Sequence, residues 1–148
     1  MSATFELTTH TTIPVAVLFE RSLSIDDHLA SMANSQERAV AGVTAGRIGL
    51  GESVTWRARH FGIRFRMTST ITALAEPHRF VDEQLKGPFK EFRHEHRFST
   101  ADGVTTMSDH LTFTAPFGLL GRIVERLVLA RYLERLIVER NIFLTRPL

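Results

Sequence analysis

Cysteine is absent from this chain of 148 residues, which also has only one tryptophan and one tyrosine. Without thiols the protein forms no disulfide, thiolate zinc site or iron–sulfur cluster, and it has no cysteine nucleophile. An excess of one charge is lacking too, because 18 Lys and Arg residues stand against 16 Asp and Glu residues, a formal net charge of +2. Since the lack of cysteine fits a reducing compartment, we expect a cytoplasmic protein.

Long hydrophobic runs are also missing. The N-terminal segment alternates polar with apolar residues, unlike a secretory signal, and no stretch approaches the roughly 20 apolar residues that cross a bilayer. A composition of 43% hydrophobic and 23% charged residues is typical of globular proteins and excludes a disordered chain. We therefore expect a soluble protein without a transmembrane segment, in which residues 1–148 form a single domain.

Most of the chain alternates in hydropathy and is broken by glycine, proline and an Asp-Gly pair, a pattern typical of strands joined by tight turns. The strands that this pattern predicts are residues 4–12, 40–43, 53–60, 63–75, 80–85, 90–99 and 104–114. Apolar residues at helical spacing predict two short helices, 14–23 and 24–32, and a long C-terminal helix, 117–144. The predicted fold class is therefore α+β.

One layer of antiparallel strands has a face to bury, and only the last helix carries enough apolar surface to cover it. We expect a curved seven-stranded sheet wrapped around this helix, with the two short helices after the first strand. Side chains often do not fill the space between a strongly curved sheet and one helix. The predicted architecture therefore makes an internal cavity plausible.

Several local motifs accompany this order of elements. They are Phe80-Val81-Asp82-Glu83-Gln84, Gly87-Pro88-Phe89, Phe92-Arg93-His94-Glu95-His96-Arg97-Phe98, Asp102-Gly103, Met107-Ser108-Asp109 and Pro116-Phe117-Gly118. With the order of elements, they resemble the helix-grip fold of the START and birch-pollen-allergen superfamily (SRPBCC), and within it a bacterial branch described as cyclase-like or cell-division-inhibitor-like. The resemblance implies a ligand-binding domain, but the superfamily includes carriers, enzymes and regulators, so it does not imply one chemistry.

Strand periodicity predicts which side chains point inward. A two-residue Phe61-Gly62 turn places His60 opposite Ile63, so that inward residues of both strands meet. The ligand-binding residues that we predict from periodicity, the resemblance and the last helix are Trp56, His60, Phe65, Met67, Phe92, His94, His96, Asp109, Phe113, Val124 and Leu127. They predict an apolar pocket with a few polar groups for a small, mostly hydrophobic molecule of lipid, polyketide or aromatic type.

The polar residues of this set allow more than one chemistry. Asp109 is expected opposite either His94 or His96, depending on whether the connecting loop has four residues or six. The two histidines could bind a metal with Asp109 or His60 as third ligand, or they could act with Asp109 as acid and base in a cyclase- or isomerase-like enzyme. We favour histidines that line a cavity and hydrogen-bond to Asp109, and we expect no metal and no cofactor.

Arginines on the opposite side of the predicted sheet form the strongest basic feature. The Phe61-Gly62 turn sets Arg59 against Arg64 and Arg57 against Arg66, and like charges directly opposite each other are unfavourable. These arginines therefore need solvent, acidic neighbours such as Asp82 or Glu83, or an anionic partner. We interpret this side, and the alternating Arg and Glu residues of the last helix up to Arg140, as solvated surface without nucleic-acid binding. An interaction module acting through these arginines is the alternative, and the apolar arc of the last helix leaves room for a homodimer.

Overall fold

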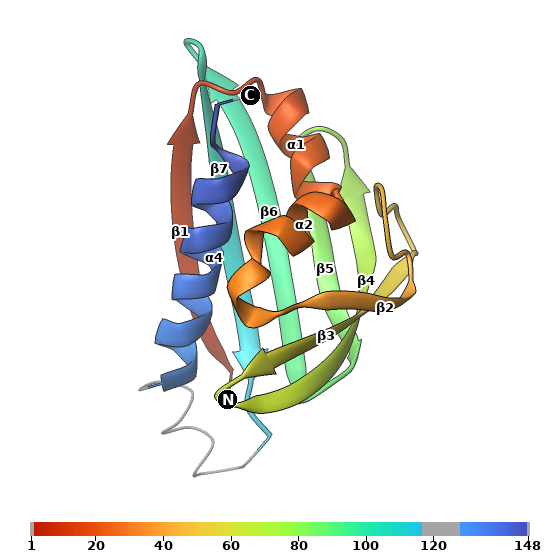
Figure 1. The fold of residues 1–148 in the computed structure, drawn as a ribbon. Coiled ribbons are helices and arrows are strands. Elements are labelled where there is room, and N and C mark those ends of the chain that lie inside the picture. The colour runs from red at the N-terminus through yellow and green to blue at the C-terminus, as the bar shows by residue number, and fades with distance from the viewer. Residues whose placement is uncertain (1, 117–127, 148) are drawn as a thin grey trace.

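The structure, a computed structural model, describes residues 2–116 and 128–147. A strand, two short helices and a 3₁₀ turn are followed by six strands and a C-terminal helix (Figure 1). The strands are β1 (Ala3–Thr11), β2 (Arg38–Gly42), β3 (Ser53–His60), β4 (Ile63–Ala75), β5 (Arg79–Lys86), β6 (Glu91–Ala101) and β7 (Val104–Thr114). The helices are α1 (Val15–Leu23), α2 (Ile25–Ser31), η1 (Ala33–Ser35) and α4 (Ala130–Leu144).

The first helices begin where local chemistry favours a helix start. Pro14 directly precedes α1, where its missing N–H costs no hydrogen bond. The side chain of Ser24 caps α2 by accepting a 3.1 Å hydrogen bond from the backbone N–H of Asp27. Both helices were predicted to within one residue at each end, whereas residues 117–127 of the predicted long helix lie outside the described part of the chain.

All seven strands belong to one antiparallel sheet with the order β1-β7-β6-β5-β4-β3-β2. The sheet curls so that β2 and β3 bend toward the side that carries the helices (Figure 1). Helix α4 runs in front of β1 and β7, while α1 and α2 lie in front of the middle strands. This is the predicted helix-grip fold.

Two hairpins fix which side chains point inward. Phe61 and Gly62 both have positive φ, 54° and 73°, as a tight two-residue turn requires, and His60 pairs with Ile63 as predicted. The β6–β7 loop has only two residues, because Ala101 pairs with Val104. It is therefore shorter than the four or six residues considered from the sequence.

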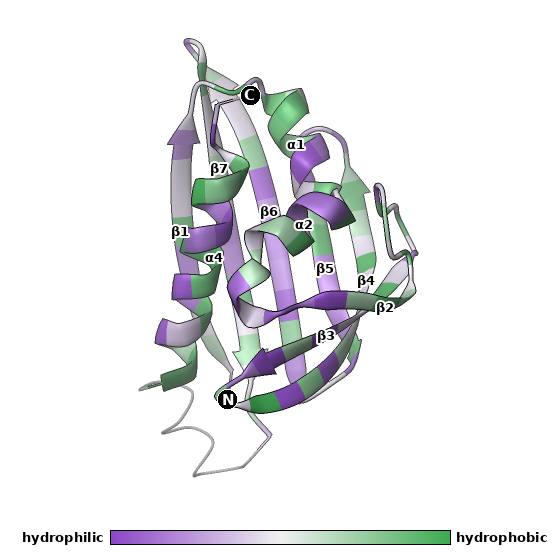
Figure 2. Cartoon of the chain, viewed as in Figure 1, coloured by the Kyte–Doolittle hydropathy of each residue, from purple (hydrophilic) through white to green (hydrophobic). Residues whose placement is uncertain are grey.

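The resulting alternation is visible as bands of hydrophobic and hydrophilic residues along β3 and β4 (Figure 2). The main core gathers around Phe19 of α1, which has no exposed surface and meets the rings of Phe80 and Phe98 edge-on. A second core cluster, Leu111, Phe113 and Ile137, lies where α4 packs on the sheet. In the described part of the chain, no helix has the length and apolarity to cross a membrane.

Candidate functional site

A cavity of about 840 Å³ lies between the curved sheet and the helices. Its walls come from α1, α2, strands β3 to β6 and α4, so the fold itself creates it. Most of the lining is apolar. Seven residues predicted to line a pocket are on its wall: Trp56, His60, Phe65, Met67, Phe92, His94 and His96.

The remaining predicted residues lie elsewhere. Phe113 has no exposed surface and packs in the core cluster with Leu111 and Ile137, and Asp109 is fully buried behind the wall. Both are on β7, whose inner side is covered by Ile137 and the residues that follow it on α4. This covering closes β7 off from the cavity, which the periodicity of a single strand cannot reveal. Val124 and Leu127 lie outside the described residues.

Asp109 is the centre of a buried hydrogen-bond network. Nε2 of His94 donates to its Oδ1 over 2.7 Å, and Nδ2 of Asn141 donates to its Oδ2 over 2.7 Å. Nη2 of Arg140 also donates to Oδ1, over 3.0 Å. The carboxylate thus joins the cavity wall on β6 to helix α4.

Arg140 differs from the sequence expectation, which placed it on the exposed side of the last helix. It is only 5% exposed and lines the cavity. A charged side chain can stay buried here because Asp109 and the amide oxygen of Asn141 accept its hydrogen bonds, the latter at 3.0 and 3.1 Å. The spacing Leu133, Ile137, Arg140, Leu144 contains the signal, since it sets Arg140 on the buried stripe of the helix.

Asp82 also differs from its expected place among the outer arginines. It lines the cavity and accepts a 2.7 Å hydrogen bond from Nε2 of His96. The other ring nitrogen of His96 lies 3.4 Å from Oδ1 of Asp109 and 3.5 Å from Nη1 of Arg140. The ring of His96 is stacked between those of His94 and Phe80, at centroid distances of 3.7 and 4.0 Å. Asp82, His94, His96, Asp109 and Arg140 therefore form one polar cluster.

Burial and neighbouring charges set the ionisation of this cluster. Burial, assisted by the nearby His96, lowers the pKa of His94 to about 4, so the ring is neutral near pH 7. Burial alone would raise the pKa of Asp109, but the charge of Arg140 and the histidine hydrogen bonds outweigh it and hold that pKa well below its usual range. Burial would also raise the pKa of Asp82, and the hydrogen bond from His96 reverses the effect. Because Asp109 is a carboxylate, His94 carries its proton on Nε2.

A second polar group on the cavity wall joins the predicted residue His60 to residues that the sequence analysis did not single out. The hydroxyl of Tyr132 on α4 lies 2.5 Å from Nδ1 of His60. His28 bonds to Glu37, and its ring lies against Trp56 with the centroids 4.3 Å apart. Burial lowers the pKa of His60 and raises that of Tyr132. The cavity thus offers polar partners at two separate places.

Among the described residues, Asp82, His94 and His96 form a group that could hold a metal ion, because each offers one ligand atom and these atoms lie within 4.8 Å of one another. Two histidines and a carboxylate are a known metal-binding set. Here, however, His96 and Asp82 are already bonded to each other, and the guanidinium of Arg140 lies beside His96. We therefore interpret the polar cluster as a hydrogen-bonded network and not as a metal centre.

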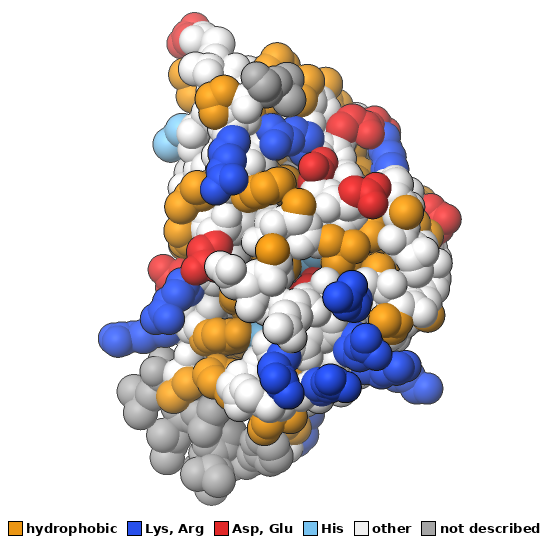
Figure 3. All heavy atoms as spheres, viewed as in Figure 1, with side chains coloured by type: hydrophobic (Ala, Val, Ile, Leu, Met, Phe, Trp, Pro, Cys, Tyr) orange, Lys and Arg blue, Asp and Glu red, His pale blue; other side chains and the backbone are white. Residues whose placement is uncertain are grey.

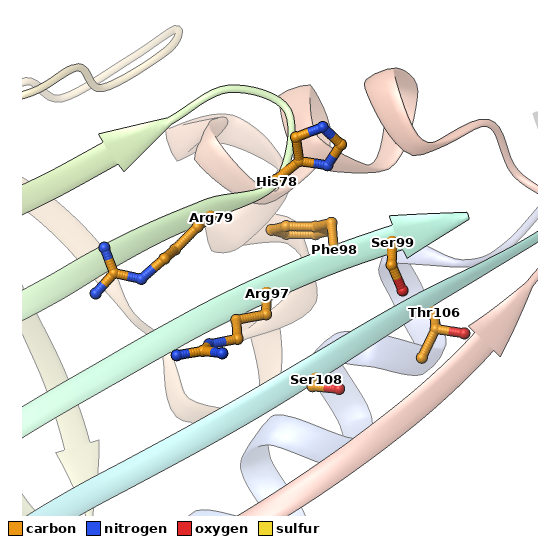
Figure 4. A pocket seen from close by; sticks show the side chains of 7 residues that line it. All are labelled: His78, Arg79, Arg97, Phe98, Ser99, Thr106 and Ser108. Atoms are coloured by element: carbon orange, nitrogen blue, oxygen red, sulfur yellow. The ribbon is translucent and has the colours of Figure 1, made fainter. Parts of the chain in front are cut away.

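A smaller hollow of about 470 Å³ is open on the outer side of the sheet (Figure 4). Arg79 and Arg97 lie along it, and both donate to Glu95, at 2.6 and 3.0 Å. The single carboxylate of Glu95 thus holds both guanidinium groups against the sheet and balances part of their charge. The internal cavity, with its apolar walls and converging polar groups, is therefore the stronger candidate site.

Comparisons with protein-family models and with curated proteins give no match. Solved structures, in contrast, share the fold over nearly the full length. The Zhui aromatase/cyclase from Streptomyces sp. R1128 aligns with a TM-score of 0.77 at 17% identity, covering 98% of this chain and 92% of that one. A START superfamily protein from Mycobacterium smegmatis has a TM-score of 0.71 at 12% identity, covering 93% of this chain and 94% of that one.

A third similar structure comes from a plant. The ginseng major latex-like protein 151 from Panax ginseng has a TM-score of 0.68 at 12% identity and covers 99% of both chains. Identities this low show the fold alone. The helix-grip architecture expected from the motifs is thus confirmed, while the cell-division-inhibitor-like branch stays a prediction.

Proposed function

We propose that this protein binds a small, mostly hydrophobic molecule of lipid, polyketide or aromatic type in the internal cavity. The observation that carries the proposal is the cavity itself, about 840 Å³, within the range of small-molecule sites. A packed protein interior leaves few voids larger than a water molecule. An interior space of this size with mostly apolar walls therefore supports a binding role better than a structural one.

Apolar and polar residues of the cavity wall contribute differently to ligand binding. Trp56, Phe65, Met67 and Phe92 supply apolar contact area, and the polar cluster lies at one wall. A ligand hydroxyl or carbonyl placed there meets His94, His96 and Arg140, groups already held by hydrogen bonds within the protein. Because these side chains are already ordered, they can orient a ligand with little further loss of conformational entropy on binding.

Filling the cavity tests this proposal. Ala58 is a buried lining residue, so A58F adds a ring to the cavity, whereas A75F adds the same ring at an exposed end of β4. With 1-anilinonaphthalene-8-sulfonate as probe, A58F should weaken binding at least tenfold and A75F should leave it within about twofold. Equal affinities in both variants would show that the probe binds elsewhere and would contradict the proposal. Native mass spectrometry of protein purified from its own host would then identify the chemical class of any retained ligand.

A cyclase- or isomerase-like enzyme is the second candidate, because the His94–Asp109 pair beside a cavity has the form of an oriented acid–base group. Similarity to an aromatase/cyclase fits this reading. Two observations favour binding instead. Asp109 is fully buried and can act only through the neighbouring residues that line the cavity, and a His94 pKa of about 4 makes His94 a weak base near neutral pH.

Turnover separates the two candidates. If the wild-type protein transforms a bound aromatic polyketide while H96A and D109N bind it unchanged, the enzyme is supported. Recovery of the intact molecule after prolonged incubation with wild-type protein supports the carrier. The measurement is mass spectrometry of the released ligand.

A further inference from the structure

The outer side of β2, β3 and β4, together with the end of β5, carries a concentration of positive charge. Its residues, which we call the basic patch, are Arg38, Arg57, Arg59, Arg64, Arg66 and Lys86. Strand pairing places Arg57 directly opposite both Arg38 and Arg66, and Arg59 opposite Arg64. In Figure 3, Lys and Arg side chains gather at the lower right, over the region of β2 to β4.

No carboxylate balances this charge within the described residues. Of the ion pairs formed there, none includes a residue of the basic patch. The acidic neighbours expected from the sequence are occupied elsewhere, since Asp82 points into the cavity and Glu83 lies 3.7 Å from Arg93. Like charges on directly opposed strand positions are unfavourable, so the patch is suited to an anionic partner outside the chain.

The hairpin between β3 and β4 adds an apolar tip to the basic patch. Phe61 and Ile63 are each 58% exposed, although both are large and hydrophobic. Phe61 comes two residues after Arg59, and Ile63 comes directly before Arg64. Both also line the cavity. Val128, 46% exposed, lies on the same lining. The cavity therefore reaches the surface at an apolar rim beside the basic patch.

We propose that this face docks on an anionic lipid surface, with the tip of the β3–β4 hairpin entering the bilayer interface and the basic patch contacting lipid phosphates. Membranes are anionic surfaces that attract clustered Lys and Arg and also accept apolar side chains beneath their headgroups. A nucleic acid or an acidic protein would meet the charge but would leave Ile63 without an apolar environment. The placement of the cavity rim at this tip would let a hydrophobic ligand pass between bilayer and protein without crossing water.

Vesicle co-sedimentation tests the docking without requiring a known ligand. Phosphatidylcholine vesicles containing about one third phosphatidylglycerol are compared with pure phosphatidylcholine vesicles over a range of NaCl concentrations. Binding should require the anionic lipid and weaken with salt. Each arginine near such a surface contributes about fivefold in affinity, so R59Q/R64Q should reduce the partition coefficient about thirtyfold.

The chain offers a matched control for charge. R79Q/R97Q removes the same number of charges from the same sheet, but both arginines already form ion pairs with Glu95. This variant should bind vesicles within about threefold of the wild type, and circular dichroism should show both variants folded. If the two variants lose affinity equally, net charge alone governs adsorption and the docking face is wrong.

Insertion of the tip has its own measurement. Fluorescence of F61W should be quenched by vesicles whose lipids carry bromine on the acyl chains, and the wild type, with only Trp56, gives the background. Absence of added quenching would overturn the proposal, and so would equal or tighter binding of a DNA duplex at the same ionic strength. Because the probe of the cavity and the vesicles report separately, failure of docking leaves the ligand-binding proposal standing, and the reverse also holds.

Discussion

The guanidinium of Arg140 lies 3.0 Å from the carboxylate of Asp109, and both side chains are almost completely removed from solvent. The pair joins the last helix to a strand 31 residues earlier in the chain. Since the same carboxylate also accepts from His94 and Asn141, one buried charge holds together three side chains of the site.

Replacing Asp109 should therefore cost much stability. In D109N the charge of Arg140 loses its counterion in a buried place, and breaking such a pair typically costs about 3–5 kcal/mol. The free energy of unfolding, measured with urea, should fall by about this amount. The matched variant D102N changes an exposed residue of the β6–β7 turn, where asparagine also tolerates positive φ, and should stay within about 0.5 kcal/mol. A loss below 1 kcal/mol in D109N would show that Arg140 finds solvent or another partner.

The stability of the protein should depend on pH through His94. Its pKa is 6.5 in the unfolded chain and about 4 in the folded one, so between these values only the unfolded chain binds the proton. The contribution of neutral His94 to the free energy of unfolding is therefore fully present above pH 6.5 and is lost progressively as the pH drops toward 4. At about 1.4 kcal/mol for each pH unit of this interval, the loss reaches roughly 3 kcal/mol. His60, whose pKa burial also lowers, acts in the same direction.

Urea unfolding at several pH values measures this slope. H94Q should flatten the profile between pH 6.5 and 4, whereas H78Q, at an exposed position, should keep it. Asp82 and Asp109 have lowered pKa values and lose their contribution below their ordinary value of 3.8, so their effect appears at lower pH. An unchanged slope in H94Q would mean that His94 is not buried in its neutral form.

Trp56 should report on the cavity directly. It is the one tryptophan of the chain, it lines the cavity and its ring lies against His28. An apolar probe entering the cavity should shift the emission of Trp56 to shorter wavelength or quench it, with saturation at one site. The W56F protein provides the background. If saturating probe leaves the emission unchanged, the probe does not reach this wall.

The core under the first helix should tolerate truncation poorly. Phe19 is fully buried and meets Phe80 and Phe98, so F19A should lose about 3–5 kcal/mol of unfolding free energy. Phe61, of the same size but exposed, is the comparison, and F61A should change stability by less than about 1 kcal/mol. A similar loss in both variants would argue against the burial seen for Phe19.

Periodicity predicted the β3–β4 hairpin well because apolar and charged residues alternate there, which indicates the side of the sheet on which each side chain lies. In β3, the alternation of Trp56, Ala58 and His60 with arginines sets the register, and the structure has that register. Asp82 shows where the pattern fails: Phe80 and Val81 are adjacent, both apolar and both buried, so β5 gives no alternation from which to infer its direction. The β4–β5 pairing also shifts between Ile71 and Ala73, and sequence alone does not indicate such irregularities.

Arg140 was missed for a different reason. A charged residue is rarely buried without a partner, and its partner Asp109 is on a distant strand, so the local pattern of Arg and Glu suggested solvent. The side chains of Phe113 and Asp109 were correctly predicted to point toward the inner side of the sheet. On β7, however, that side is covered by α4 and does not border the cavity. Which inward residues border empty space depends on where the helix lies on the sheet, a tertiary property.

Helix α4 is attached unevenly to the rest of the protein. Its second half carries Arg140, Asn141 and Leu144, all buried, whereas Leu133 and Leu136 in its first half are only half-buried. The C-terminal half of α4 is therefore held more firmly against the sheet than the N-terminal half. If the N-terminal half of α4 tilts away from the sheet and widens the cavity, the Tyr132–His60 contact breaks first. Within α4, amide hydrogen exchange should accordingly be fastest near Ala130 and slowest near Asn141.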